Sequence, residues 1–142
     1  MSAVLALGAL AACGTRADVE IAGLQAGVTR AQYEALPDSQ RFAKESDDSR
    51  GETQGVAVDV VLKVNGYKGA SIPLDYTLHD ARNQLPFVSR RVPVTPTDES
   101  WTRTGRLWLP VPSAGTYYVQ VVLGDSTGRE AKGPRTEDFT IR

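Results

Sequence analysis

The sequence predicts an all-β fold, an antiparallel β-sandwich of about six to seven strands. Short runs of the 142-residue chain alternate apolar and polar residues, and turn-forming residues separate these runs. Between the runs there is no long stretch with a helical period. Because parallel strands need crossover helices, this pattern favours an antiparallel sandwich over a βαβ fold. The length fits one domain with its own hydrophobic core.

The sandwich is expected to occupy residues 55–142. Its predicted strands are 56–64, 72–78, 88–94, 101–111, 117–123 and 139–141. The first of these has five apolar residues in strict alternation, which is typical of a half-buried strand. The stretch 115–123 is rich in aromatic and β-branched residues between two turn segments and is the expected central strand. Pro73 predicts an edge position or a bulge, because proline donates no hydrogen bond to a ladder.

The segment Pro112-Ser113-Ala114-Gly115-Thr116-Tyr117-Tyr118-Val119 resembles the corner and penultimate strand of immunoglobulin-like and fibronectin type III-like modules. The resemblance implies an immunoglobulin-like sandwich in which Tyr117 is the corner tyrosine. It also puts Val119 where antibody domains carry a cysteine. Many unrelated modules share this architecture, so the resemblance implies a fold and no activity.

The N-terminal residues 1–12 are interpreted as a signal peptide. The uncharged run 3–12 is too short to span a bilayer and ends in small residues immediately before Cys13, the single cysteine. The residues Leu10-Ala11-Ala12-Cys13 resemble a bacterial lipobox. The resemblance implies cleavage before Cys13, lipidation of its sulfur and membrane anchoring in the cell envelope. It implies the outer membrane in a two-membrane host, and otherwise the outer face of the cytoplasmic membrane. The alternative is a buried N-terminal helix with an inert thiol.

Residues 13–54 are expected to form a lipid-anchored tether between the anchor and the sandwich. The most polar part, residues 38–54, is interpreted as a solvated linker. It includes the Asp47-Asp48 pair, which has too few oxygen ligands at the required spacing to indicate a calcium site. Before it, Thr29-Arg30-Ala31-Gln32 has the form of a helix capping box, and Pro37 ends the predicted helix. The alternation of Val19 and Ile21 fits either an edge strand or a spacer, and the sequence leaves this question open.

Composition and side-chain chemistry argue against several function classes. Sixteen Lys and Arg balance seventeen Asp and Glu, so no overall positive charge favours nucleic-acid binding. One histidine, His79, and one distant cysteine do not make a tetrahedral metal site, and no cofactor is expected. His79 and Asp80 are strand neighbours whose side chains point to opposite faces, so they do not form part of a catalytic triad. The chain is therefore expected not to be an enzyme.

The candidate binding surface consists of outward-facing side chains on two predicted strands. Alternation places Arg106 and Trp108 outward on one strand, and Tyr118 and Gln120 outward on the other. Aromatic residues with arginine are frequent at interaction hot spots, and flat aromatic faces suit sugar rings. The alternative is that this face is covered, either by residues 19–42 or by packing between the sheets.

These observations predict a non-catalytic envelope lipoprotein that presents an immunoglobulin-like binding module. Its expected partner is another envelope protein, which would bind an exposed edge strand or the aromatic surface. A cell-wall glycan bound through the exposed aromatic residues is the alternative. A third class, an envelope enzyme or an enzyme accessory subunit, has the least support in the sequence.

Overall fold

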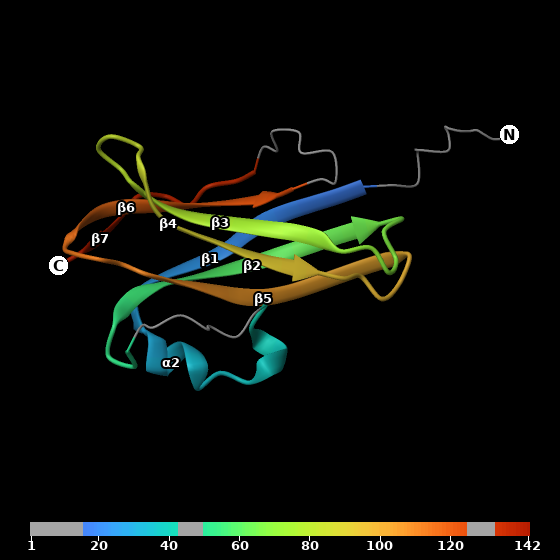
Figure 1. The fold of residues 1–142 in the computed structure, drawn as a ribbon, viewed down its shortest axis with the longest axis horizontal. Coiled ribbons are helices and arrows are strands. Elements are labelled where there is room, and N and C mark those ends of the chain that lie inside the picture. Colours follow the sequence, from blue (N-terminus) through green and yellow to red (C-terminus); the bar gives the residue numbers. More distant parts are fainter. Residues whose placement is uncertain (1–15, 43–49, 125–132) are drawn as a thin grey trace, which may run out of the picture.

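The computed structural model describes residues 16–42, 50–124 and 133–142. In these residues, seven strands form two antiparallel sheets with the orders β1-β2-β5 and β4-β3-β6-β7 (Figure 1). The predicted all-β fold, an antiparallel sandwich of six to seven strands, is thereby confirmed. The predicted signal peptide, Cys13 and the Asp47-Asp48 pair lie outside the described residues.

The elements follow the chain in a simple order. They are β1 (Arg16–Thr29), α2 (Arg30–Glu34), the short 3-10 helix η1 (Asp38–Gln40), β2 (Gln54–Asn65), β3 (Ile72–Asp80), β4 (Pro86–Val94), β5 (Ser100–Pro110), β6 (Gly115–Leu123) and β7 (Phe139–Ile141). Strands β2 to β7 match the six strands that alternation predicts. The stretch 115–123 is an inner strand of its sheet, between β3 and β7.

Strand β2 is the centre of the three-stranded sheet and supplies one half of the core. Its residues Val56, Val58, Val60, Leu62 and Val64 are all at most 1% exposed. They face apolar residues of the second sheet, which include Leu74 and Leu78 of β3 and Val119 and Val121 of β6. Burying a side chain of this size contributes about 1.5–3 kcal/mol, so the interior between the sheets is the main source of stability.

The expected tether at residues 13–54 needs correction over its described part. Residues Arg16–Thr29 form β1, a 14-residue edge strand paired antiparallel with β2 from Arg16–Asn65 to Thr29–Gln54. Val19 and Ile21 pack against the core, so the alternation seen in the sequence belongs to an edge strand. The physical reason is that β2 has an unpaired edge whose backbone groups need partners, and this segment supplies them.

The predicted helix is present and closes over the outer face of the first sheet. Thr29 is the N-cap of α2, and the capping box has both of its hydrogen bonds, from Gln32 N–H to Thr29 Oγ1 and from Thr29 N–H to Gln32 Oε1. Figure 1 shows α2 and η1 lying outside the sheet β1-β2-β5. The helix has only five residues, so its stability comes from packing rather than from its own length.

The prediction that Pro73 marks an edge or a bulge is wrong. Pro73 lies in β3, between β4 and β6, and pairs with Pro93 of the true edge strand β4. Its position is tolerated because the ladder between β3 and β6 begins only at Leu74, so no donor is required from residue 73 on that side. Its carbonyl accepts a hydrogen bond from Gly124 N–H at 2.9 Å.

The corner that carries the immunoglobulin-like resemblance has the expected contact. The hydroxyl of Tyr117 donates to the Ser113 carbonyl at 2.8 Å and also lies 3.3 Å from Ser113 Oγ. Tyr117 is 2% exposed, and its ring packs near Phe139. The bond ties the β5–β6 connection to the start of β6. Val119, two residues further, is fully buried, as expected for a core position.

Replacing Tyr117 with Phe should therefore destabilise the domain by about 1 kcal/mol, because it removes the hydrogen bond from the Tyr117 hydroxyl to the Ser113 carbonyl. Urea denaturation monitored by circular dichroism measures the change. The control is Tyr118→Phe, since Tyr118 contacts its neighbours through its ring. Equal stability of the two variants would contradict a role for the corner hydrogen bond.

Candidate functional site

The structure buries Trp108, which the sequence analysis placed on an exposed surface. Trp108 is on the outer face of its sheet, as predicted, but it is only 1% exposed. The ring of Tyr33 from α2 stacks over it with centroids 6.3 Å apart, and its indole N–H donates to the Val28 carbonyl at 2.9 Å. Gly55 allows this packing, because a Cβ there would lie 2.5 Å from the indole ring. The alternative that residues 19–42 cover this face is thus correct for Trp108.

Tyr118 is also buried, at 7% exposure, and lies on the other sheet. Its ring lies between two neighbours: His79 stacks at 4.8 Å with an interplanar angle of 4°, and the Arg135 guanidinium lies 3.7 Å from the ring centroid. Arg135 also pairs with Asp138. This stack fastens the segment before β7 onto β6 through cation–π and stacking contacts.

The four predicted surface residues therefore do not form one site. Trp108 and Arg106 belong to β5 in the first sheet, while Tyr118 and Gln120 belong to β6 in the second. Alternation gave the direction of each side chain correctly. Alternation does not show which sheet a strand joins or what packs on the outer face of that strand. These two properties determine whether an outward side chain is exposed and which side chains share a surface.

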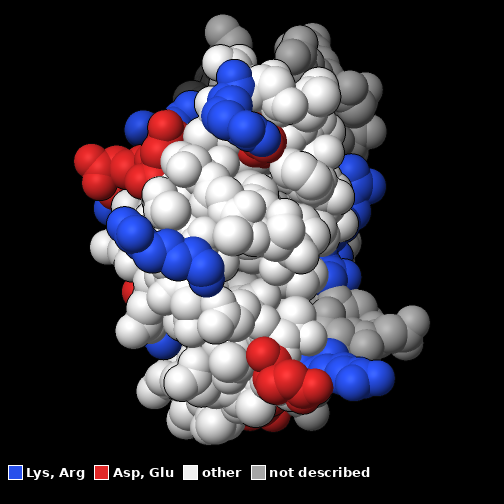
Figure 2. Space-filling view, turned by 90° about the vertical axis from the view of Figure 1, so that its left-hand side faces the viewer, with Lys and Arg blue, Asp and Glu red and all other residues white. Residues whose placement is uncertain are grey.

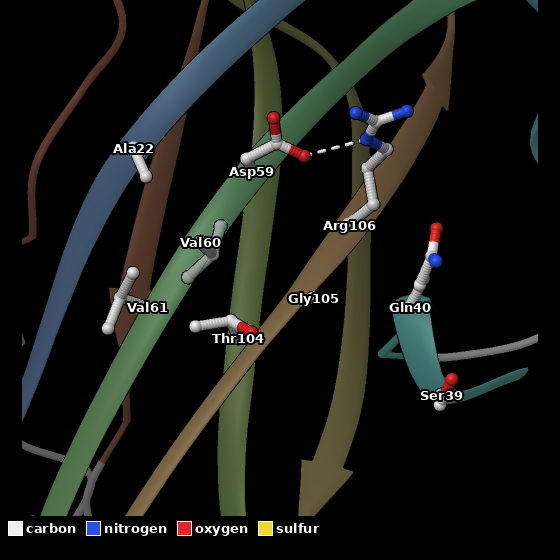
Figure 3. Close-up of a pocket in the computed structure, with 9 residues that line it drawn as sticks. All are labelled: Ala22, Ser39, Gln40, Asp59, Val60, Val61, Thr104, Gly105 and Arg106. Atoms are coloured by element: carbon white, nitrogen blue, oxygen red, sulfur yellow. Dashed lines mark hydrogen bonds and ion pairs between the residues drawn. The ribbon is translucent and has the colours of Figure 1, made fainter.

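Arg106 remains accessible and lies in a groove of about 270 Å³ on the outer face of the sheet β1-β2-β5. Its Nε donates to Asp59 Oδ1 at 2.6 Å across the β2–β5 ladder. Ser39 and Gln40 of η1 lie on one side of the groove and Ala22 of β1 on the other (Figure 3). The groove is small and its polar groups are preformed, so it suits a small polar ligand.

A second candidate surface, which the sequence analysis missed, is the β3–β4 hairpin. Leu85 is 61% exposed and Phe87 is 51% exposed. They are the two large apolar side chains that are exposed to solvent among the described residues. Figure 2 shows this end of the molecule, where separate charged groups surround a continuous uncharged area. We call Leu85, Pro86 and Phe87 the hairpin patch.

A register shift positions Phe87. Leu78 pairs with Val88 and His79 pairs with Pro86, so Phe87 is the extra residue of a β-bulge. Its ring meets the Tyr117 ring edge-on at 5.7 Å. Bulges re-aim side chains and are often found beside functional sites. Alternation cannot reveal a bulge, which explains why sequence reasoning did not single out Phe87.

The loop that carries the hairpin patch is held by its own polar groups. Asp80 Oδ1 accepts from the Arg82 N–H at 2.7 Å, and the Asp80 backbone pairs with Gln84 and Leu85. Gln84 has a φ of 62°, and Asn83 Oδ1 accepts from the Leu85 N–H at 2.9 Å. The hydrogen bond from the Arg82 N–H, with help from the Arg82 guanidinium, lowers the pKa of Asp80 below 3.8 despite its burial.

The outer edges of both sheets are poorly suited to pairing with another strand. β1 is interrupted by two register shifts, and β4 carries Pro86 and Pro93. The β5 edge is partly occupied, because Phe42 N–H donates to the Arg106 carbonyl at 3.1 Å. β7 has only three residues. Bulges, prolines, covered edges and short strands are the usual protections against edge-to-edge pairing.

The geometry offers little for catalysis or metal binding in the part of the chain that the structure describes. His79 faces outward onto Tyr118, whereas Asp80 is 7% exposed and bonded within its turn, so the two do not act together. No cluster of three or more His, Cys, Asp or Glu side chains within the described ranges is arranged to hold a metal ion. The helices found there are also too short and too polar to cross a membrane.

Comparison with known proteins gives only distant structural similarity. No family model matches the chain, and no curated protein does. A β-glucosidase involved in saponin metabolism from intestinal bacteria is similar with a TM-score of 0.45 and 16% identity. The match covers 90% of this chain, which spans only 16% of that one. A structural genomics target is similar with a TM-score of 0.31 and 12% identity, over 91% of this chain and 86% of the other. Neither similarity indicates a family or a function.

Replacing Asp80 with Asn tests the electrostatic part of the hairpin turn. Because the folded-state pKa of Asp80 is lowered, its charge stabilises the fold above the unfolded pKa of 3.8, and this contribution disappears as the pH falls through the lower folded pKa. We therefore expect Asp80→Asn to be less stable than the parent at pH 7, with the difference disappearing as the pH falls below 3.8 and through the lowered folded-state pKa. Urea denaturation at a series of pH values measures it. A pH-independent difference would exclude the charge as the cause.

Proposed function

We propose that this chain is a non-catalytic lipoprotein of the bacterial cell envelope that presents its immunoglobulin-like sandwich to another envelope protein. The anchor would be the lipidated Cys13, as the lipobox resemblance implies. The hairpin patch is the observation that carries the binding role. Two large apolar side chains, Leu85 and Phe87, are more than half exposed although the domain has a well-filled core. Exposed apolar groups gathered at one place mark interaction sites.

The rigidity of the hairpin supports this role. The Asp80 turn and the Asn83 side chain hold the loop in one conformation through hydrogen bonds. A loop that is already ordered loses little conformational entropy when it binds, so a small patch gives more affinity than a mobile one. The protected sheet edges favour docking through side chains over strand addition.

The position of the patch relative to the proposed anchor also supports presentation. β1 begins at Arg16, three residues after Cys13, a separation that an extended chain spans in about 11 Å. A lipidated Cys13 would thus hold the beginning of β1 close to the bilayer. The β3–β4 hairpin lies at the opposite end of the sandwich (Figure 1). The patch would face away from the membrane without a long tether.

The first prediction from this proposal concerns the anchor. Cys13→Ser should move the protein from the membrane fraction to the soluble fraction of the envelope, or leave it as an uncleaved precursor with its full N-terminal mass. Fractionation and intact mass spectrometry of the parent and variant measure this. A parent protein without an added lipid mass would refute lipidation.

The second prediction concerns the hairpin patch. A photo-crosslinker at Asn83 in intact cells should capture one reproducible protein, and Leu85→Ser combined with Phe87→Ser should reduce this capture at least tenfold. The double variant should keep its fold, because both side chains are largely outside the core.

Val122→Ser is the matched control, since Val122 is a half-buried apolar residue on β6, distant in sequence from the hairpin. It should leave the crosslink unchanged. Equal loss of the crosslink in both variants, or the same protein captured from a crosslinker at Val122, would contradict the hairpin as the binding surface.

A further inference from the structure

A second polar feature, separate from the hairpin patch, lies on the outer face of the sheet β1-β2-β5. Asp59 of β2 and Arg106 of β5 are directly opposite each other in the ladder. They share a single contact, from Arg106 Nε to Asp59 Oδ1 at 2.6 Å. Asp59 Oδ2 and the two terminal Arg106 nitrogens make no hydrogen bond or ion pair with the described residues. These side chains are 42% and 32% exposed, so the free atoms can be reached from solvent.

A similar cross-strand pair on the other sheet shows how different this arrangement is. Arg91 of β4 lies opposite Asp75 of β3 and makes two contacts with it, Nε to Oδ1 at 2.7 Å and Nη2 to Oδ2 at 3.1 Å. Both carboxylate oxygens are used, and the hydrogen bond raises the pKa of Arg91 above its ordinary value. The Asp75–Arg91 pair is therefore closed, whereas the Asp59–Arg106 pair is open.

The backbone around Asp59 keeps the open pair accessible. Gly23 pairs with Asp59 next to a bulge in β1, and a Cβ at Gly23 would lie 2.8 Å from Asp59 Oδ2. The glycine thus leaves this oxygen uncovered on the β1 side. On the other side, Gln40 of η1 lines the groove (Figure 3). The result is a concave site of about 270 Å³ with fixed donors and a fixed acceptor.

We propose that this groove binds one unit of a neutral polyhydroxylated ligand, a sugar residue of a glycan. A hydroxyl group both donates and accepts, so adjacent hydroxyls match the free Arg106 donors and the free Asp59 acceptor together. A simple anion would approach Asp59, and a simple cation would approach Arg106, so the paired charges disfavour both. The methyl groups of Ala22 and Val61 provide a short apolar surface for the carbon face of the ring.

This site requires neither the lipid anchor nor the hairpin patch. It also differs from the glycan surface expected from the sequence, because Trp108 and Tyr118 are buried. Arg106 is the one residue of that predicted surface that the groove retains.

Saturation-transfer NMR with glucose, galactose, mannose and N-acetylglucosamine as probes tests the proposal on the full chain, solubilised in detergent. At least one sugar should give a saturable signal in the millimolar range. Asp59→Ala should weaken its binding about tenfold, as expected for loss of a charged hydrogen-bond partner. Gln40→Ala, on an exposed residue outside the sheet, should weaken it by a smaller factor without affecting the fold.

Asp75→Ala is the matched control, because it breaks the closed Asp–Arg pair on the other sheet. It should leave sugar binding unchanged, and so should the Leu85→Ser, Phe87→Ser double variant. The absence of saturable binding by all four sugars would overturn the proposal, and so would equal binding by the parent, Asp59→Ala and Gln40→Ala. Either result would leave the hairpin crosslink unaffected, so failure here is distinguishable from failure of the proposed function.

Discussion

The register of β2 between β1 and β5 determines both the core and the outer face of the first sheet. Its alternating side chains place five aliphatic residues in the core and put Ala57, Asp59 and Val61 on the outer face. A shift by one residue would exchange these two sets, at a cost of several buried side chains. The same register sets Ala57 opposite Trp108 and Asp59 opposite Arg106. The packing of the core therefore also determines which residues lie on the outer face.

The N-terminal segment, residues 16–42, covers one edge and part of the outer face of this sheet. β1 satisfies one edge of β2, and α2 then returns across the outer face to cover Trp108. The Tyr33 hydroxyl and the Phe42 N–H both bond to the Arg106 carbonyl, which fixes the segment to β5. Arg103 adds a contact over the Phe42 ring at 4.7 Å. These contacts make residues 16–42 part of the domain and leave the short groove beside η1.

Among the described residues, two of the exposed features differ in chemistry and in position. The hairpin patch is apolar, lies at the end away from the start of β1, and is held by a hydrogen-bonded turn. The groove at Asp59 and Arg106 is polar and lies on the outer face of the first sheet. A domain carrying both would contact a protein at its tip and a sugar at its side. Both features belong to the same sandwich, so its two sheets fix the separation between them.

The strands can be predicted from the sequence, because alternation reports which face of each strand is buried. The 56–64 run, the corner at Tyr117 and the capping box at Thr29 depend on neighbours close in the chain, and all three were predictable. Three other features follow from contacts between segments that are distant in the chain: β1 joins the sandwich, α2 covers Trp108 and a bulge turns Phe87 outward. The open Asp59–Arg106 pair likewise joins residues 47 positions apart in the chain. Such outcomes depend on which strands pair and what packs on their outer faces, and local periodicity carries no information about either.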